Sequence, residues 1–256
     1  MNFATITQFP EIARWSTRFV GNSVSQRQLA RQTGDFLRKL GHPVSVHSGF
    51  DRDLEKNVVV VSAEYDVDRD ELGKRRYIGI TLTTNPKSKK KIKFDEVMAN
   101  SLSLDLLEAL CHEYRHEHQY RVRDFDVYGV FKSTLKDVEE RHQQEYLGIP
   151  DEIDAFAVNI AIRLWLIHGA AAYAKLQECE AMDYDSSPDL WGYFQAFGSQ
   201  HEVTRRLIRK IVKNLNALND WTSECIKNGI VSSDQLSLQS ISSGSATYNL
   251  KQAISE

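Results

Sequence analysis

The pattern of polar and apolar positions near the start of the chain predicts a helix. Residues 23–40, SVSQRQLARQTGDFLRKL, have a helical pattern, and either Ser23 or Ser25 is placed to cap the first turn. Gly41 and Pro43 follow directly and end the run, because neither residue continues a helix well. We therefore expect the first helix to end at about residue 40.

Three segments with strand patterns come next. PVSVHS (43–48) alternates, NVVVVSAEYDV (57–67) is rich in β-branched residues, and RYIGITLTT (76–84) returns after the turn-like DRDELGKR. We expect the last two to form a hairpin closed by a turn around Gly73. The basic segment NPKSKKKIKF (85–94) then leads out of a small sheet.

The remainder of the chain has helical patterns. Residues 101–120 carry leucines at helical spacing, 151–175 are strongly apolar, and 202–227 are amphipathic. A polar link precedes Pro150, and the serine-rich tail 230–256 could be loosely ordered or docked on a partner.

This order of helix, sheet and helices predicts an α+β fold. It would have an N-terminal helix and a small, mainly antiparallel sheet, followed by a helical C-terminal half. We expect a single domain over 1–229, with the sheet-containing half at about 1–100 and the helical half at about 101–229.

Composition narrows the class of protein. The 256 residues are 41% hydrophobic and 26% charged, as in an ordinary soluble protein, and the net charge of -3 argues against a general nucleic-acid binder. The three scattered cysteines indicate free thiols in a reducing compartment. No secretory signal and no uninterrupted membrane span are found, so we expect a cytoplasmic protein without a membrane partner.

The candidate chemistry lies in LCHEYRHEHQYR. On a helix, His112 and His116 are one turn apart on the same face and can bind one metal ion. Glu113 is adjacent and can reach a metal-activated water as a general base without ligating the metal. His118 points to another side of the helix, and Cys111 falls on the apolar face, where a free cysteine acts as a small hydrophobe.

These residues resemble the HExxH motif of the zincin metallopeptidases, whose fold places a sheet before the active-site helix. The segments HEYRHEHQYR and GIPDEIDAFAVNIA also look loosely like uncharacterised zincin-like proteins of tailed bacteriophages. The metzincin pattern is excluded, because Gln119 and Val122 stand where it needs glycine and histidine. The motif departs from the zincin consensus at Arg115 and Glu117, which bears more on peptidase activity than on metal binding.

The gluzincin pattern implies a third ligand from a later helix, a glutamate followed three residues on by a small residue. Glu152 and Ala155 match that pattern, with Pro150 and Asp151 at the helix start and Asp151 as the expected cap. Asp154 is a second candidate for the ligand or for a residue that orients the histidines. His142 is a third, and would make a three-histidine site like that of SprT-type proteins.

The resemblance implies a zinc-dependent hydrolase, a peptidase of peptide or protein substrates, with Zn²⁺ on His112, His116 and Glu152 and with Glu113 as the base. Tyr184, Tyr193 and His201 are downstream candidates for stabilising the oxyanion, although none lies in a motif. The alternative is a non-catalytic structural or interaction protein on a zincin scaffold. It would be virion-associated if phage-encoded, with an assembly partner bound through the tail.

Two basic segments are expected to be solvated. KSKKKIKF carries five lysines, which suit an exposed loop or a protected sheet edge better than a nucleic-acid site. RRLIRKIVK places its charges along one side of the predicted helix 202–227, and an exposed helix face is the simplest interpretation.

Overall fold

The computed structural model describes residues 3–125, 138–178 and 187–228 of the chain. It forms two compact units, one ending at Phe125 and the other made by the chain after it. The expectation of a single domain over 1–229 stays a prediction. The serine-rich tail 230–256 and Tyr184 lie outside the described residues.

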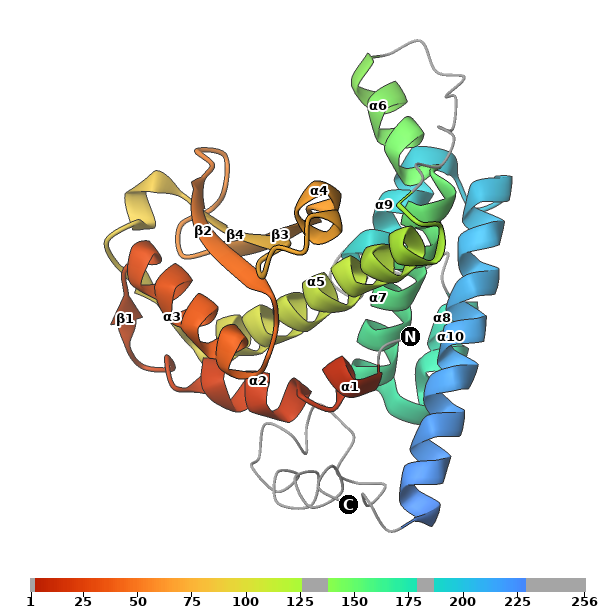
Figure 1. Ribbon diagram of the computed structural model, residues 1–256, viewed down its shortest axis with the longest axis horizontal. Coiled ribbons are helices and arrows are strands. Elements are labelled where there is room, and N and C mark those ends of the chain that lie inside the picture. Colours follow the sequence, from red (N-terminus) through yellow and green to blue (C-terminus); the bar gives the residue numbers. More distant parts are fainter. Residues whose placement is uncertain (1–2, 126–137, 179–186, 229–256) are drawn as a thin grey trace. The chain divides into compact units, whose positions relative to one another are not determined.

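The first unit contains the sheet and the helix that carries HExxH (Figure 1). Its elements, in chain order, are α1 (Phe3–Ile6), α2 (Phe9–Thr17), β1 (Ser23–Val24), α3 (Gln26–Lys39), β2 (Val44–Phe50), β3 (Val59–Tyr65), α4 (Val67–Glu71), β4 (Ile78–Thr84), the 3₁₀ helix η1 (Pro86–Ser88), β5 (Ile92–Lys93) and α5 (Glu96–Val122). The predicted first helix is confirmed as α3, and Ser25 is its cap, because its side chain accepts a hydrogen bond from the Gln28 backbone N–H. Gly41, at φ 93°, follows its end.

The main sheet has three strands in the order β2-β4-β3. β4 pairs with β3 in antiparallel fashion and with β2 in parallel fashion, and β1 and β5 form a separate antiparallel pair. The prediction of a mainly antiparallel sheet is therefore wrong for the main sheet, which is mixed. The predicted pairing of the last two strands is confirmed, but their connection contains the helix α4 before Gly73 and is not a simple turn.

One face of this sheet is apolar and packs against helices. Along the central strand, Ile78, Ile80 and Leu82 are fully buried, whereas the alternate residues are partly exposed. α3 contacts β2 and β4, and α5 contacts β3. Figure 1 shows α3 and α5 along the same side of the sheet. Because side chains alternate between the two faces of a strand, the apolar residues all lie on one face of the sheet, and α5 packs there.

The second unit, in its described part, is helical (Figure 1). Its elements are α6 (Val138–Leu147), α7 (Pro150–His168), the 3₁₀ helix η2 (Gly169–Ala171), α8 (Ala172–Gln177), α9 (Pro188–Phe197) and α10 (Glu202–Lys227). The predicted helix 202–227 is confirmed. The polar link expected before Pro150 is wrong in part, because Val138–Leu147 is helical. Its hydrophilic sequence shows no clear apolar stripe, which is why the pattern did not indicate a helix.

α7 and α10 pack together in this unit. α10 contributes a stripe of buried residues at helical spacing, Leu207, Ile211, Leu215 and Leu218. Pro150–Gln177 is long and apolar enough to span a bilayer by composition, but 61% of its apolar window is buried inside the structure. That burial is typical of the core helix of a folded unit.

Candidate metal centre

α5 is a long helix whose start is fixed locally. The Asp95 side chain caps it by accepting a hydrogen bond of 2.8 Å from the Met98 backbone N–H. The helix therefore begins five residues before the predicted position at 101. The first half of the helix is held by the buried residues Ala99, Leu102 and Leu106. The HExxH residues lie in the second half of the same helix.

The structure brings the two motif histidines together. The Nε2 atoms of His112 and His116 lie 3.0 Å apart, and the side chains are buried, with 7% and 8% of their surface exposed. A tetrahedral zinc ion with Zn–N bonds of about 2.0–2.1 Å holds two ligand nitrogens about 3.3–3.4 Å apart. A shift of a few tenths of an ångström converts the observed pair into zinc ligands, so the geometry fits that ion.

Gln119 orients one of these histidines. Its Oε1 atom lies 2.9 Å from Nδ1 of His116, and Gln119 is itself buried. A carboxamide oxygen only accepts, so Nδ1 of His116 carries the proton and Nε2 presents its lone pair. That is the tautomer a metal requires. In the sequence, Gln119 serves to exclude the metzincin pattern, and its position three residues after His116 is the signal that could have indicated this contact.

Glu113 and the residues that flank the motif lie on the sides of α5 that the helical spacing predicts. Glu113 is buried, with 4% of its surface exposed, whereas His118 is exposed, which confirms that His118 points to another side of α5. Cys111 is buried, and burial raises the pKa of its thiol far above the usual range. It is therefore a small hydrophobic residue and not a thiolate, as predicted.

Tyr114, the next residue, is tied to the loop before β2. Its hydroxyl lies 2.8 Å from Nδ1 of His42. Burial lowers the pKa of His42 to about 4 and raises that of Tyr114 far above its usual range, so both groups stay neutral at neutral pH. The contact holds α5 at the centre of the motif without placing a charge beside it.

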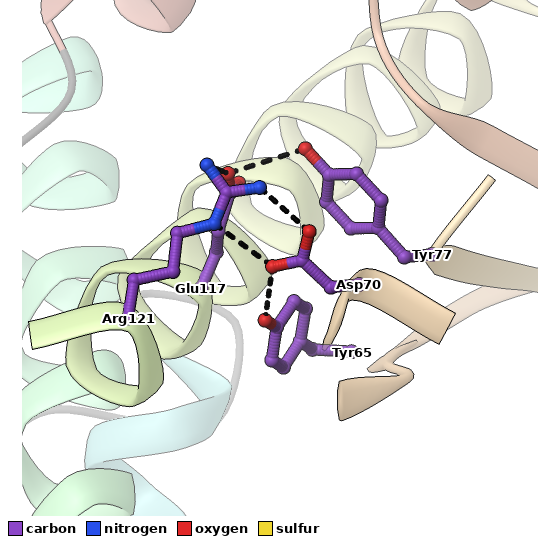
Figure 2. A network of polar contacts seen from close by, with 5 residues as sticks. All are labelled: Tyr65, Asp70, Tyr77, Glu117 and Arg121. Carbon is purple, nitrogen blue, oxygen red and sulfur yellow. Dashed lines mark hydrogen bonds and ion pairs between the residues drawn. The ribbon is translucent and has the colours of Figure 1, made fainter. Parts of the chain in front are cut away.

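A polar network fixes the end of α5 (Figure 2). Arg121 donates two hydrogen bonds to the Asp70 carboxylate, at 2.9 and 2.6 Å, and pairs with Glu117 at 2.8 Å. The hydroxyl of Tyr65 donates to Asp70 at 2.5 Å, and that of Tyr77 donates to Glu117 at 3.1 Å. The network thus joins α5 to β3, to α4 and to the residue before β4.

The two carboxylates of this network shift in opposite directions, because burial raises the pKa of Glu117 whereas the pKa of Asp70 is lowered. Burial raises the pKa of Tyr77 to about 12, with a further contribution from the nearby Glu117 charge. Burial acts to raise the pKa of Asp70, but hydrogen bonds from Arg121 and Tyr65 outweigh it and lower the pKa. Glu117, one of the two departures from the zincin consensus, therefore belongs to the support of α5.

The other ligand candidates lie in the second unit. α7 begins at Pro150 with Ile149 as its cap residue, so Asp151 is in the first turn and is not the cap that was predicted. Glu152 is in the same turn and is partly buried. Asp154 pairs with Lys210 of α10 at 2.5 Å, which gives this carboxylate a structural role between two helices. His142 is exposed on α6.

Two of the oxyanion candidates have structural roles. Tyr193 is fully buried and donates a hydrogen bond of 2.9 Å to the Leu147 backbone oxygen. His201 is the cap of α10, and its Nδ1 atom accepts from the Val203 backbone N–H at 3.2 Å. Neither arrangement resembles a donor held ready for a substrate.

Comparisons with protein-family models, with curated protein sequences and with solved structures give no match for this chain. The case for a function therefore rests on the residues themselves.

Proposed function

We propose that this chain is a zinc-dependent hydrolase that cleaves peptide bonds. One observation carries the proposal: two buried imidazoles on α5 present Nε2 atoms 3.0 Å apart, and Gln119 holds one of them in the metal-binding tautomer. In the metal-free protein the Nε2–H of His112 donates to the Nε2 lone pair of His116, and a bound zinc ion would take the place of that proton between the two nitrogens. The HExxH spacing adds a buried carboxylate, Glu113, beside the first ligand.

The proposed third ligand is Glu152. His112, His116 and Glu152 offer two imidazole nitrogens and one carboxylate oxygen. This donor set is that of catalytic zinc sites, which keep the fourth position for water. Asp154 is the weaker candidate for the third ligand. Its carboxylate already forms an ion pair with Lys210, with 2.5 Å between the two atoms.

The chemistry that zinc supplies at such a site is a water whose pKa is close to neutrality and a polarised substrate carbonyl. The oxygen of the water attacks the carbonyl carbon, and Glu113 accepts the proton that this water gives up. Glu113 then gives this proton to the amine nitrogen as the carbon–nitrogen bond breaks. Gln119 fixes the ring of His116 and burial on α5 restricts that of His112, so these two imidazoles would hold the zinc ion.

Metal content of the purified protein tests the site. We expect about one equivalent of zinc in the wild type, a large loss in His112→Ala, and no change in His118→Ala, the matched control on the exposed side of the same helix. Zinc affinities of Glu152→Ala, Asp154→Ala and His142→Ala then identify the third ligand. A wild type that binds no zinc in chelator-free buffer contradicts the proposal.

Catalysis is tested separately. Glu113→Gln should keep the zinc and lose hydrolysis of a casein-type substrate, because the amide cannot accept the proton. Zinc binding without hydrolysis in the wild type would contradict the enzymatic proposal. It would favour the alternative, a structural or interaction protein on the same scaffold.

A further inference from the structure

The first unit has an open basic groove between α3 and β2. Its lining residues precede the HExxH motif in the sequence and include none of the motif residues. Its volume is about 430 Å³. The polar side chains that matter here are Arg27, Arg31 and Arg38 of α3, His47 and Ser48 of β2, and Arg76 before β4. β2 is an edge strand of the main sheet, which is why this side of α3 is left uncovered by a further strand.

The arginines of α3 form a stripe. Positions 27, 31 and 38, with Gly34 between them, follow one another at intervals of four, three and four residues on one helix face. The stripe is about 16 Å long at a rise of 1.5 Å per residue. A side chain at Gly34 would crowd the groove, since an added Cβ would lie 2.9 Å from a guanidinium nitrogen of Arg38.

The groove has little acidic compensation. Arg38 pairs with Asp35 at 2.7 Å, whereas Arg27, Arg31 and Arg76 are exposed and form no ion pair within the described part of the chain. Three positive charges therefore share one concave surface, and no ion pair with a described residue neutralises them. Such a surface attracts an anion with several negative charges.

The lysine-rich segment extends the positive surface. The Gln26 backbone N–H at the start of α3 donates to the Lys89 carbonyl at 3.0 Å, and Ser23 pairs with Lys93. Lys87, Lys89, Lys90, Lys91 and Lys93 are all exposed. The segment that was expected to be merely solvated thus lies at the end of α3 where the arginine stripe begins.

An exposed aromatic ring is found at the same end. Phe50, the last residue of β2, has 55% of its surface exposed. The strand alternation places Phe50 on the same sheet face as Val46, whose Cβ lies 3.4 Å from an ideal Cβ position at Gly34. Phe50 therefore shares the α3 side of the sheet with the arginine stripe.

We infer that this groove binds the phosphate backbone of a single-stranded nucleic acid, with Phe50 as a stacking platform for a base. Positive grooves combined with exposed aromatic rings are the common design of proteins that bind single strands without sequence preference. An acidic peptide would use the arginines but not the ring, and a single phosphate would use neither the length of the stripe nor the lysines. The chain's net charge of -3 does not oppose this inference, because it averages over both units.

Fluorescence anisotropy with a labelled oligodeoxythymidine of about 15 nucleotides tests the inference. The double variant Arg27→Ala/Arg31→Ala removes two phosphate contacts, and Arg14→Ala/Arg18→Ala is its control, with the same charge change and spacing on exposed positions in and just after α2. Each contact contributes about 0.7 to the slope of log K against log salt for a single strand. The groove variant should therefore lose about 1.4 in slope and bind about 25-fold more weakly at 0.1 M salt.

Two further variants probe other elements of the groove. Arg76→Ala should weaken binding and lower the salt slope by about 0.7. Phe50→Ala should weaken binding about fivefold or more with an unchanged slope, because stacking releases no counterions. Far-UV circular dichroism checks that each variant is folded. Binding by His112→Ala should equal that of the wild type, so failure of the zinc proposal leaves this result unaffected.

Three outcomes would overturn the inference. They are no binding by the wild type at micromolar concentration in low salt, equal losses in the groove variant and in the control, or preferential binding of an oligoglutamate of equal charge. A selective loss in the groove variant together with the Phe50→Ala effect supports it.

Discussion

The network around Asp70 allows a quantitative test of how α5 is held. Asp70→Ala removes the acceptor of the Tyr65 hydroxyl and both hydrogen bonds to Arg121 (Figure 2). The Tyr65 hydroxyl is partly buried, so leaving it without a partner costs towards the lower end of about 1–3 kcal/mol. Arg121 keeps 49% of its side chain exposed and regains water, so its ion pair contributes only about 0–1 kcal/mol. The free energy of unfolding should fall by about 1–3 kcal/mol.

Urea denaturation followed by circular dichroism measures this change, and Glu71→Ala, an exposed acid in the same helix α4, is the control. Asp70→Asn should lose less, because its amide oxygen still accepts from Tyr65. The lowered pKa of Asp70 also predicts how its contribution to stability depends on pH. The unfolded carboxyl, near its ordinary pKa of 3.8, binds protons first as the pH falls, so the contribution is present above that value and is lost below it. A loss below about 0.5 kcal/mol in Asp70→Ala would refute the reasoning.

Three other predictions follow from single contacts. Gln119→Leu should weaken zinc binding about 10–100-fold in a chelator competition assay, because His116 loses the acceptor that fixes its tautomer; unchanged affinity would contradict that role. His42 has its pKa lowered to about 4, so stability should fall as pH drops from about 6.5 towards 4, by about 3 kcal/mol in all, and His42→Gln should flatten this profile in urea titrations. Ser25→Ala should cost about 1 kcal/mol in the same assay, whereas Ser23→Ala should cost nothing, since only Ser25 caps α3.

The parts of the fold that the sequence predicts well depend on local chemistry. The bounds of α10 and the cap of α3 follow from helical spacing and from a serine at the right place. The pairing of His112 with His116 is of the same kind, because four residues of helix determine the distance between the two side chains.

What the sequence does not predict depends on contacts far apart in the chain. The insertion of β4 between β2 and β3 has no local signal, since strand order is decided by how whole faces pack. The bond between Asp70 and Arg121 joins residues 51 positions apart, so neither residue drew attention. The arginine groove was also missed, because its parts come from a helix, an edge strand and the residue before another strand.

The position of β4 between its two neighbours has a consequence for the order of folding. β3 and β4 are consecutive strands and close a short loop through α4, whereas β2 and β4 are joined by a longer connection that contains β3 and α4, so their pairing costs more loop-closure entropy. We expect the β3–β4 pair to form first and the layer of α3 and β2 to dock onto it later. In native-state hydrogen exchange, the β4 amides bonded to β3 should then be the last to exchange, and the edge carrying the basic groove should open first.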